Sequence, residues 1–311
     1  MIIPNINIAA EILKNGDVLA FPTETVYGLG ALAYNFEACA KIYQLKGRPT
    51  FNPLIVHVAS VSSALDLGYF NDDAIKLTKF WPGPLTIVVK ARENSPIASN
   101  VIAGLSTIAL RIPNNKTALE LIELVGPIAA PSANKSGYIS ATNHMQVEED
   151  FKGLVPVLTG DVTYGIESTI VKAYADVSIL RHGFITSKAI EDSCDIKLCL
   201  SNNINIEAPG QLLKHYSPKT LVRLNNTDFA SANSLFLTFG NYAPIGLDKI
   251  SLNLSPEGNL LEAAANLYSY LRALDKIAIE NNITYISISP IPNFDIGIAI
   301  NDRILRAASN L

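Results

Sequence analysis

Two basic residues, Lys46 and Arg48, have no acidic neighbour in the surrounding sequence. They follow a stretch from Asn35 to Leu45 in which apolar residues recur at helical spacing. An ammonium group beside a planar guanidinium is well suited to binding phosphate. Solvated surface charge would give the same triplet, so these residues alone leave both interpretations open.

A second polar segment follows the apolar run from Ile128 to Ala130. Its residues Ser132, Asn134 and Ser140 can offer hydroxyl, amide and backbone N–H groups to an anion. An ordinary hydrogen-bonded turn would use the same residue types. Because loops after strands are where α/β sheets bind ligands, the segment is a candidate ligand site.

Two polar residues lie in runs that are otherwise apolar. His57 is near the end of the run from Leu54 to Val58, where a histidine is more often a structural donor than a catalytic base. Arg111 lies in the comparable run from Ile108 to Ile112, and a guanidinium is rarely buried without a partner. Arg111 is therefore the better functional candidate of the two.

Several familiar motifs are excluded. The glycines at Gly28 and Gly30 follow a β-rich run, but no acidic residue ends a second strand at the distance that a dinucleotide site requires. Ser132 and Lys135 form an S-x-x-K pair without the S-D-N and K-T-G partners of penicillin-binding enzymes. Neither a G-x-x-x-x-G-K-[ST] phosphate loop nor a G-x-S-x-G elbow occurs, so an ATP site must be of another design.

The elements that position these residues alternate between strands and helices. Asp17 to Phe21 and Leu85 to Val89 read as further strands, and Lys116 to Leu124 reads as a helix. Strands continue to about Leu180, after which a segment with polar, proline and glycine residues and no sustained period indicates a linker. The first part of the chain is therefore predicted to be an α/β domain.

Beyond the linker, the sequence predicts a smaller α/β domain. Leu235 to Phe239 and Tyr285 to Ser289 read as strands, and Gly297 to Ala308 reads as a helix. Asn259 to Glu280 reads as a long amphipathic helix with Arg272 and Lys276 outside its apolar stripe. Core packing explains that stripe without any further function.

Length and composition set limits on the function. The 311 residues suggest two domains, and the formal charge of -4 provides no global attraction for nucleic acid. Three cysteines without metal-ligand spacing fit a reducing cytoplasm. No signal peptide and no apolar run long enough to span a bilayer is evident, so we expect a cytoplasmic protein without membrane attachment.

Taken in order, the quoted segments resemble the threonylcarbamoyl-AMP synthase family. The signatures are PTETVYGLGA, KGRP, NPLIVHV, WPGPLT, RIP, AAPSANKSG, ESTIV and LRHG, and the linker APGQLLKHYSPKT is typical of the family's longer, two-domain form. The resemblance implies a YrdC-like twisted open α/β sheet domain over residues 1–200 and a smaller Rossmann-like α/β domain over 221–311. Residues 201–220 would be a linker that acts as a lid over the active site.

The same resemblance implies a nucleotidyltransferase reaction. L-Threonine, bicarbonate and ATP, the last with Mg2+, would give threonylcarbamoyl-AMP and pyrophosphate for the threonylcarbamoyladenosine modification of tRNA. Other proteins would transfer the group to tRNA, and the acidic net charge argues against direct tRNA binding. An RNA-binding module is one rival interpretation; a carbamoyl-transfer enzyme of the hydrogenase-maturation type is another, but the sequence lacks its zinc-binding cysteine pairs and its acylphosphatase region.

Site residues follow from the resemblance position by position. Lys46 and Arg48 are expected to be the catalytic pair at the phosphates, and no metal ligands are expected among the side chains. Threonine is expected to contact Thr25, His57, Arg111, Ser168 and the backbone of Ala130. ATP is expected to contact Lys46, Arg48, Asn52, Thr107, Ser132, Asn134, Ser140, Arg181 and one member of the pair His215 and Tyr216.

Overall fold

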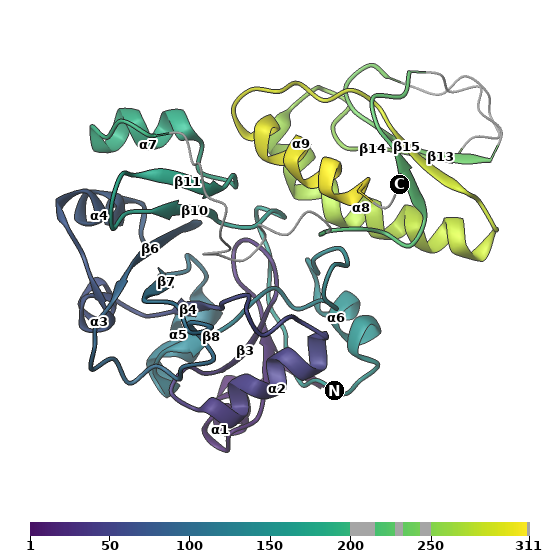
Figure 1. The fold of residues 1–311 in the computed structure, drawn as a ribbon. Coiled ribbons are helices and arrows are strands. Elements are labelled where there is room, and N and C mark those ends of the chain that lie inside the picture. Colours follow the sequence, from purple (N-terminus) through teal and green to yellow (C-terminus); the bar gives the residue numbers. More distant parts are fainter. Residues whose placement is uncertain (200–214, 228–232, 243–249, 310–311) are drawn as a thin grey trace. The chain divides into compact units, whose positions relative to one another are not determined.

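The structure is a computed structural model that describes residues 1–199, 215–227, 233–242 and 250–309 (Figure 1). The chain divides into two compact units. The first comprises Met1–Ser136, Ala141–Thr163 and Glu167–Leu212, and the second comprises Gly137–Ser140, Tyr164–Ile166 and Leu213–Leu311. The second unit thus includes two short segments that a division at residue 200 assigns to the first domain. Within the predicted linker, residues 201–214 lie outside the described residues.

The described part of the first unit contains an eleven-stranded mixed sheet. Its strands lie in the order β1-β9-β2-β3-β8-β4-β7-β6-β10-β11, and β5 pairs with β6 outside this path. The strands are β1 (Ile2–Ile3), β2 (Leu19–Phe21), β3 (Gly28–Leu32), β4 (Ile55–His57), β5 (Gly68–Tyr69), β6 (Leu85–Ala91), β7 (Thr107–Arg111), β8 (Ile128–Ala129), β9 (Val157–Leu158), β10 (Thr169–Lys172) and β11 (Ser178–Arg181).

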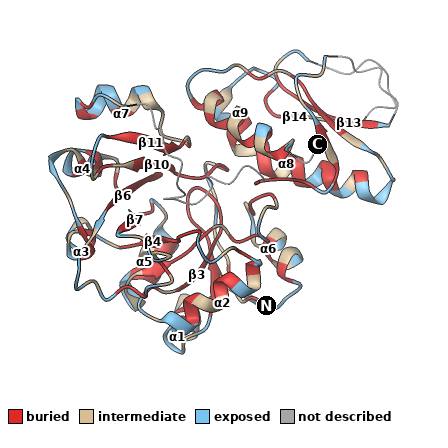
Figure 2. Cartoon of the chain, viewed as in Figure 1, coloured by how far each residue is buried: buried red, intermediate tan, exposed pale blue. Residues whose placement is uncertain are grey.

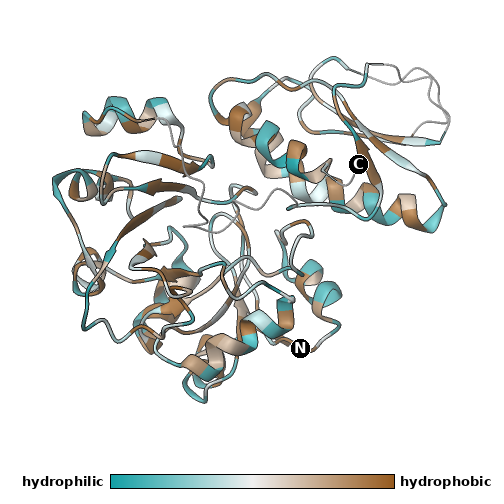
Figure 3. Cartoon of the chain, in the orientation of Figure 1, coloured by the Kyte–Doolittle hydropathy of each residue, from teal (hydrophilic) through white to brown (hydrophobic). Residues whose placement is uncertain are grey.

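Helices cover both faces of this sheet. Side chains of β2 alternate, so Leu19 and Phe21 join one core with α1 and α5, whereas Ala20 joins the other core with α2. The buried residues of the strands and the inward helix faces are coloured red in Figure 2, and the hydrophobic ones among them are brown in Figure 3. The helices are α1 (Ile6–Lys14), α2 (Phe36–Lys46), α3 (Val61–Leu67), α4 (Asp72–Leu77), the 3-10 turn η1 (Thr78–Phe80), α5 (Lys116–Val125), α6 (His144–Phe151) and α7 (Ser187–Cys194).

Helix α2 shows how local sequence places a site residue. Asn35 begins the helix by accepting a hydrogen bond from the Ala38 amide at 3.0 Å, and Gly47 ends it in the left-handed conformation, with φ 64. Lys46 lies four residues after buried Ile42, so helical periodicity puts it on the buried face. The helix that the sequence predicts from Asn35 to Leu45 is confirmed.

The glycines of β3 are explained by close packing. A side-chain carbon at Gly30 would approach both Phe21 and Ile128 to 2.7 Å, which real contacts do not tolerate. Strand β3 pairs antiparallel with β2, so the segment is not the strand-turn-helix of a dinucleotide site. The exclusion of that motif is confirmed.

The described part of the second unit contains a parallel four-stranded sheet in the order β12-β15-β13-β14. Its elements are β12 (Leu221–Arg223), β13 (Ser234–Thr238), β14 (Ser251–Asn253), α8 (Leu260–Glu280), β15 (Tyr285–Ile288) and α9 (Ile296–Ala307). Helix α8 packs on β13 and β15 and against α9. This all-parallel arrangement with packed helices agrees with the predicted Rossmann-like α/β domain.

One residue of α8 differs from the sequence interpretation. Arg272, expected outside the apolar stripe, is buried, and its guanidinium donates to the backbone carbonyls of Ile139 and Ser140. Asp275, on the same helix, accepts from the Tyr138 hydroxyl at 2.9 Å and from the Thr220 amide at 2.8 Å. Helix α8 therefore holds the segment Gly137–Ser140 with polar contacts that periodicity does not reveal. Within the described ranges, no helix combines the length and apolar character needed to cross a membrane.

Candidate active site

The strand register of the first unit sets three polar residues side by side on neighbouring strands. Parallel pairing of β4 with β7 sets His57 beside Arg111, and continuing the β7–β6 ladder by one residue brings Thr86 next to Arg111. Parallel pairing of β6 with β10 places Ile170 opposite Thr86, and the Thr86 hydroxyl reaches Ser168, which directly precedes β10, at 2.8 Å. Ser168 therefore joins the imidazole, the guanidinium and the Thr86 hydroxyl through a side-chain contact, not through the register.

Arg111 is oriented by contacts to three residues in two segments of the chain. Its Nη2 atom donates to Thr25 Oγ1 at 3.0 Å, and its Nε atom donates to the Gly83 carbonyl at 3.3 Å. The same Nη2 lies 2.8 Å from Glu24 Oε1, and both side chains are almost completely buried. Neither carboxylate oxygen of Glu24 has a hydrogen-bond partner among the described residues, so this close approach is an ion pair without hydrogen-bond alignment.

The Thr25 hydroxyl has a defined direction. Thr23 Oγ1 donates to the Val26 carbonyl at 2.6 Å, so in its 2.8 Å contact with Thr25 Oγ1 it acts as the acceptor. Thr25 therefore donates to Thr23 and accepts from Arg111. Because a hydroxyl has one proton and two lone pairs, the Thr25 oxygen can bind a ligand only as an acceptor.

His57 is a neutral imidazole in this environment. Burial, and to a smaller extent the nearby charge of Arg111, lowers its pKa to about 3. Its ring meets the Phe21 ring edge-on, with centroids 6.0 Å apart, and within the described structure its Nδ1 atom has no hydrogen-bond partner. At neutral pH it adds no charge and offers a hydrogen-bonding nitrogen beside Arg111.

Ser168 is fixed from two sides. Arg181 donates to its carbonyl from Nε at 3.2 Å and from Nη2 at 2.9 Å, and Nη2 also lies 3.1 Å from the Ser168 hydroxyl. The Thr86 hydroxyl contacts the same Ser168 hydroxyl at 2.8 Å. Arg181, predicted to contact ATP, thus also positions a residue predicted to contact threonine.

Lys46 and Arg48 are anchored to backbone carbonyls. Lys46 Nζ donates to the carbonyls of Ser132 at 2.6 Å and Asn134 at 2.5 Å, and burial holds the pKa of this lysine well below its usual value. Arg48 donates from Nε to the Asn52 carbonyl at 3.1 Å and from Nη2 to the Pro53 carbonyl at 2.9 Å. The pair is therefore not solvated surface charge, and Lys46 ties the serine-containing loop to the end of α2.

Not every predicted residue makes a contact described above for Arg111, Ser168, Lys46 and Arg48. Thr107 is at the opposite end of β7 from Arg111, roughly 13 Å of strand away. Ser140, His215 and Tyr216 belong to the second unit. There Tyr216 stacks on Tyr268 with ring centroids 5.6 Å apart. The roles assigned to these four residues stay predictions.

Sequence reasoning missed three residues with direct contacts to the cluster. Glu24 was not singled out, although a lone acidic residue in the otherwise uncharged stretch around PTETVYG is a usable signal. Thr86 and Gly83 gave no such signal, because only the register and the WPGP turn bring them to Ser168 and Arg111. The WPGP segment, to which no chemistry was assigned, supplies an orienting carbonyl.

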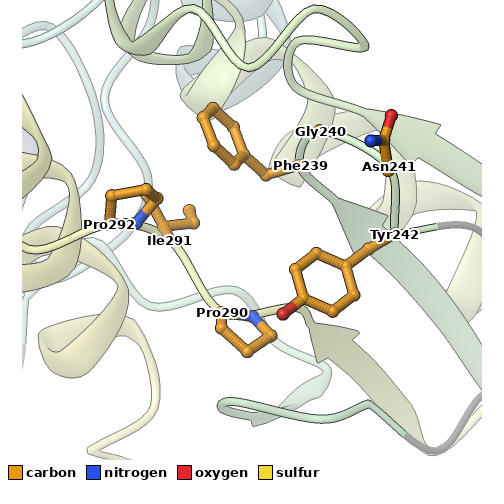
Figure 4. A pocket seen from close by; sticks show the side chains of 7 residues that line it. All are labelled: Phe239, Gly240, Asn241, Tyr242, Pro290, Ile291 and Pro292. Atoms are coloured by element: carbon orange, nitrogen blue, oxygen red, sulfur yellow. The ribbon is translucent and has the colours of Figure 1, made fainter.

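A separate cavity of about 590 Å3 lies in the second unit, at the carboxyl ends of β13 and β15 (Figure 4). It is lined by Phe239, Gly240, Asn241, Tyr242, Pro290, Ile291 and Pro292. None of these lining residues is charged, so the cavity offers no ion pair to a phosphate or carboxylate. In the first unit, Arg111 keeps the N–H groups of its Nη1 atom without an acceptor among the described residues, so this unit is the better place for anionic substrates.

Two protein families match the chain. The Sua5, YciO and YrdC family, described as telomere recombination, matches residues 11–183, and the C-terminal domain of threonylcarbamoyl-AMP synthase matches residues 185–309. A threonylcarbamoyl-AMP synthase of Bacillus subtilis is 37% identical over 98% of this chain and 93% of its own length. The chain belongs to the threonylcarbamoyl-AMP synthase family.

Solved structures agree with this two-domain family. The crystal structure of Pyrococcus abyssi Sua5 complexed with L-threonine has a TM-score of 0.89 and 31% identity, covering 99% of this chain and 98% of that one. Escherichia coli YciO, at 20% identity and a TM-score of 0.52, covers 59% of this chain and 93% of its own, and it shares the fold of that part. The family match therefore extends over both units and includes the long form's C-terminal domain.

Proposed function

We propose that this enzyme condenses L-threonine, bicarbonate and ATP into threonylcarbamoyl-AMP and pyrophosphate. Membership of the threonylcarbamoyl-AMP synthase family over nearly the whole chain supports the proposal. The observation that carries it at the level of residues is the buried Arg111, which lies beside His57 on the neighbouring strand and donates to Thr25. The threonine-bound Pyrococcus relative, similar over the full chain, makes L-threonine the first ligand to test.

In the proposed complex, the threonine carboxylate binds Arg111. Of the five N–H donors of a guanidinium, those on Nη1 have no acceptor among the described residues, so they are available to a carboxylate. Neutral His57 and the Thr25 oxygen offer hydrogen-bonding positions beside it. The backbone of Ala130, whose N–H donates to the Ile55 carbonyl at 2.9 Å, is fixed next to this group through β4.

ATP would bind at the end of the site defined by Lys46 and Arg48. Asn52, Ser132, Asn134 and Arg181 are the other first-unit residues proposed for this ligand. Both cations are held by carbonyls before any ligand arrives, so little rotamer entropy is lost when phosphate binds. Thr107, Ser140 and one of His215 and Tyr216 are carried in the proposal from the family resemblance alone.

The reaction needs neutralisation of charge rather than a covalent nucleophile. A carbamate oxygen on the threonine nitrogen attacks the α-phosphorus of ATP, the new P–O bond forms, and the bond to the β-phosphate oxygen breaks to release pyrophosphate. Two anions approach each other in this step, so fixed cations and Mg2+ stabilise the developing charge. Within the described residues no cluster of three or more His, Cys, Asp or Glu side chains could hold a metal, and we propose that Mg2+ arrives on the ATP phosphates.

The intermediate would then pass to other proteins that modify tRNA. A threonylcarbamoyl adenylate is prone to hydrolysis, which gives the predicted lid over residues 201–220 a purpose. Both the downstream proteins and the lid belong to the proposal. Direct binding of tRNA is not part of it.

Mass spectrometry of a short incubation tests the proposal. The purified chain is mixed with ATP, Mg2+, L-threonine and bicarbonate, and each component is omitted in turn. Threonylcarbamoyl-AMP and pyrophosphate are expected only in the complete mixture. Intact ATP in every mixture, combined with salt-sensitive RNA binding, would instead support the RNA-binding alternative.

A further inference from the structure

Glu24 is a buried carboxylate without the hydrogen bonds that such groups normally have. It is 2% exposed, and neither of its oxygens accepts a hydrogen bond from any described residue. Buried polar side-chain atoms are nearly always paired, and a carboxylate can accept several donors. The adjacent hydroxyls of Thr23 and Thr25 bond to each other, to Val26 and to Arg111 instead. The site therefore keeps acceptor atoms unused next to its principal cation.

The charges around Glu24 are complementary to a zwitterion. Arg111 is positive, Glu24 is negative, and their nearest atoms are 2.8 Å apart. His57 is neutral at physiological pH because burial lowers its pKa to about 3. An α-amino acid carries its carboxylate and its ammonium group on the same carbon atom. If the carboxylate binds Arg111, the ammonium falls within reach of a carboxylate next to that arginine.

The chemistry gives that carboxylate a second task. A protonated amine has no lone pair, so threonine must lose one proton before its nitrogen can attack bicarbonate. A side chain within hydrogen-bond reach of the ammonium group, directly or through one water, can serve as the base for this proton. Among the described residues that contact Arg111, Glu24 is the one carboxylate, and neither of its oxygens accepts a hydrogen bond from a described residue.

We propose that Glu24 binds the α-ammonium group of L-threonine and removes its proton to start carboxylation. The inference rests on the proposed function. The proton moves from nitrogen to a Glu24 oxygen, and the free amine attacks the bicarbonate carbon. The N–C bond forms, the C–OH bond breaks, and the hydroxyl leaves as water with the second amine proton. The carbamate remains, and Glu24 returns its proton to solvent after turnover.

The competing explanation is that Glu24 only neutralises Arg111. Replacement by glutamine would then weaken the fold or misplace the guanidinium, but its effect on rate would not depend on the protonation of threonine. A base role predicts the opposite, because raising the pH supplies amine that needs no base. The pH dependence of the variant relative to the wild type therefore separates the two explanations.

The other charged and titratable groups are the same in the variant and the wild type, so the ratio of the two kcat/KM values cancels their titration. Arg111 on β7 contributes a guanidinium, and His57 on β4 is neutral above its pKa of about 3. Lys46, whose pKa burial lowers well below the usual value, contributes equally to both proteins. Tyr27, in the same loop as Glu24, has a pKa raised to about 12, mainly by burial. The Thr163 amide donates to the Glu24 carbonyl at 3.0 Å, which brings the loop containing Asp161 alongside, and Asp161 carries a carboxylate. A change in the ratio of variant to wild-type kcat/KM between pH 7 and 9 is thus expected to report on the substrate amine.

The experiment compares Glu24→Gln with the wild type across this range. At pH 7 the variant's kcat/KM for threonine should fall about 100-fold or more, the usual contribution of a general base. The ratio of variant to wild-type kcat/KM should rise about tenfold per pH unit while the pH stays below the pKa of the threonine amine. KM for ATP should change less than twofold. Glu24→Asp, which keeps the charge, should recover part of the rate, and Glu93→Gln, at an exposed position of the same unit, should behave as the wild type.

Each outcome decides the inference. If wild-type enzyme makes threonylcarbamoyl-AMP and Glu24→Gln retains at least a third of its kcat/KM, or shows a pH-independent ratio, Glu24 is not the base. If the wild type makes no product at all, the proposed function fails instead. The melting temperature in the presence of ATP identifies a variant that has not folded. If Glu24→Gln does not fold, the pH dependence of the ratio of Glu24→Asp to wild-type kcat/KM decides instead.

Discussion

The two ends of the proposed site are built differently. Around Arg111, side chains meet side chains, and the acceptor atoms of Glu24 and the Nδ1 atom of His57 have no partner within the described structure. Around Lys46 and Arg48, the cations are bound to backbone carbonyls of the loops they touch. The first arrangement has unused hydrogen-bonding capacity, whereas the second uses much of its capacity to hold loops.

This difference indicates different tasks. An end with unsatisfied polar atoms and both signs of charge can discriminate a small zwitterion from other ligands. A ligand that does not pair these atoms leaves them buried without hydrogen bonds, which weakens its binding. An end in which cations are fixed in advance can stabilise a charge that develops only during reaction, with little reorganisation. Substitutions at the Arg111 end should therefore act on threonine, and those at the Lys46 end on ATP and on local structure.

The largest expected effect is at Arg111. Arg111→Ala removes the proposed carboxylate partner and leaves Glu24 buried without its counter-charge, so kcat/KM for threonine should fall roughly 1,000-fold. KM for ATP should stay within a few-fold of the wild-type value. Steady-state pyrophosphate release at varied threonine and ATP measures both. Arg92→Ala, which removes an exposed arginine of the same unit, is the control. An equal loss for both substrates would contradict the division into two ends.

Arg48→Ala should have the next largest effect, and on the other substrate. The variant loses a fixed cation at the phosphates as well as the contacts to Asn52 and Pro53, so kcat/KM for ATP should fall roughly 100-fold. Threonine binding measured by calorimetry without ATP should be nearly unchanged. A variant that loses threonine binding to the same extent would show that the loop, rather than the charge, is what matters.

The sequence predicts the elements better than the contacts between them. The runs at Leu54 to Val58 and Ile108 to Ile112 correspond to β4 and β7, because apolar β-rich runs are local signals. That these two strands are neighbours, with His57 opposite Arg111, depends on sheet order and register, which no local pattern encodes. The family resemblance supplied the grouping that periodicity could not.

The same limit explains the site residues that were missed. Thr86 contacts Ser168 across 82 positions of sequence, and an isolated threonine in a strand has no distinguishing pattern. The burial of Lys46 follows from its place on the inner face of α2, but its two carbonyl partners lie in a loop 86 and 88 residues away. Residue type and spacing thus predict that a cation is present, and only the fold shows what it holds.

The burial of His57, at the Arg111 end of the site, can be tested by the pH dependence of the unfolding free energy. Its folded pKa of about 3 lies below the usual 6.5, so the unfolded chain binds the proton between these values and the folded chain does not. Stability is therefore complete above pH 6.5 and is lost as the pH falls toward 3. Relative to His57→Gln, which does not titrate there, the wild type should lose about 2 kcal/mol of unfolding free energy between pH 7 and pH 5. Urea denaturation of both proteins at both pH values measures the difference. If the unfolding free energy of the wild type and of His57→Gln changes equally with pH, the imidazole is solvated.

The smallest effect should come from Thr86→Val, which nearly preserves shape and removes one hydroxyl. Ser168 would lose its 2.8 Å contact to Thr86 but keep Arg181, so about 1 kcal/mol, or roughly fivefold in kcat/KM for threonine, is expected. Thr78→Val, which removes a hydroxyl that bonds only to the Ile75 carbonyl of its own turn, is the matched control for the change of residue type. A loss as large as that of Arg111→Ala would mean that the position of the Ser168 hydroxyl matters as much for kcat/KM with threonine as the Arg111 charge does. A loss confined to ATP would place Ser168, together with its clamp Arg181, at the phosphate end of the site rather than at the threonine end.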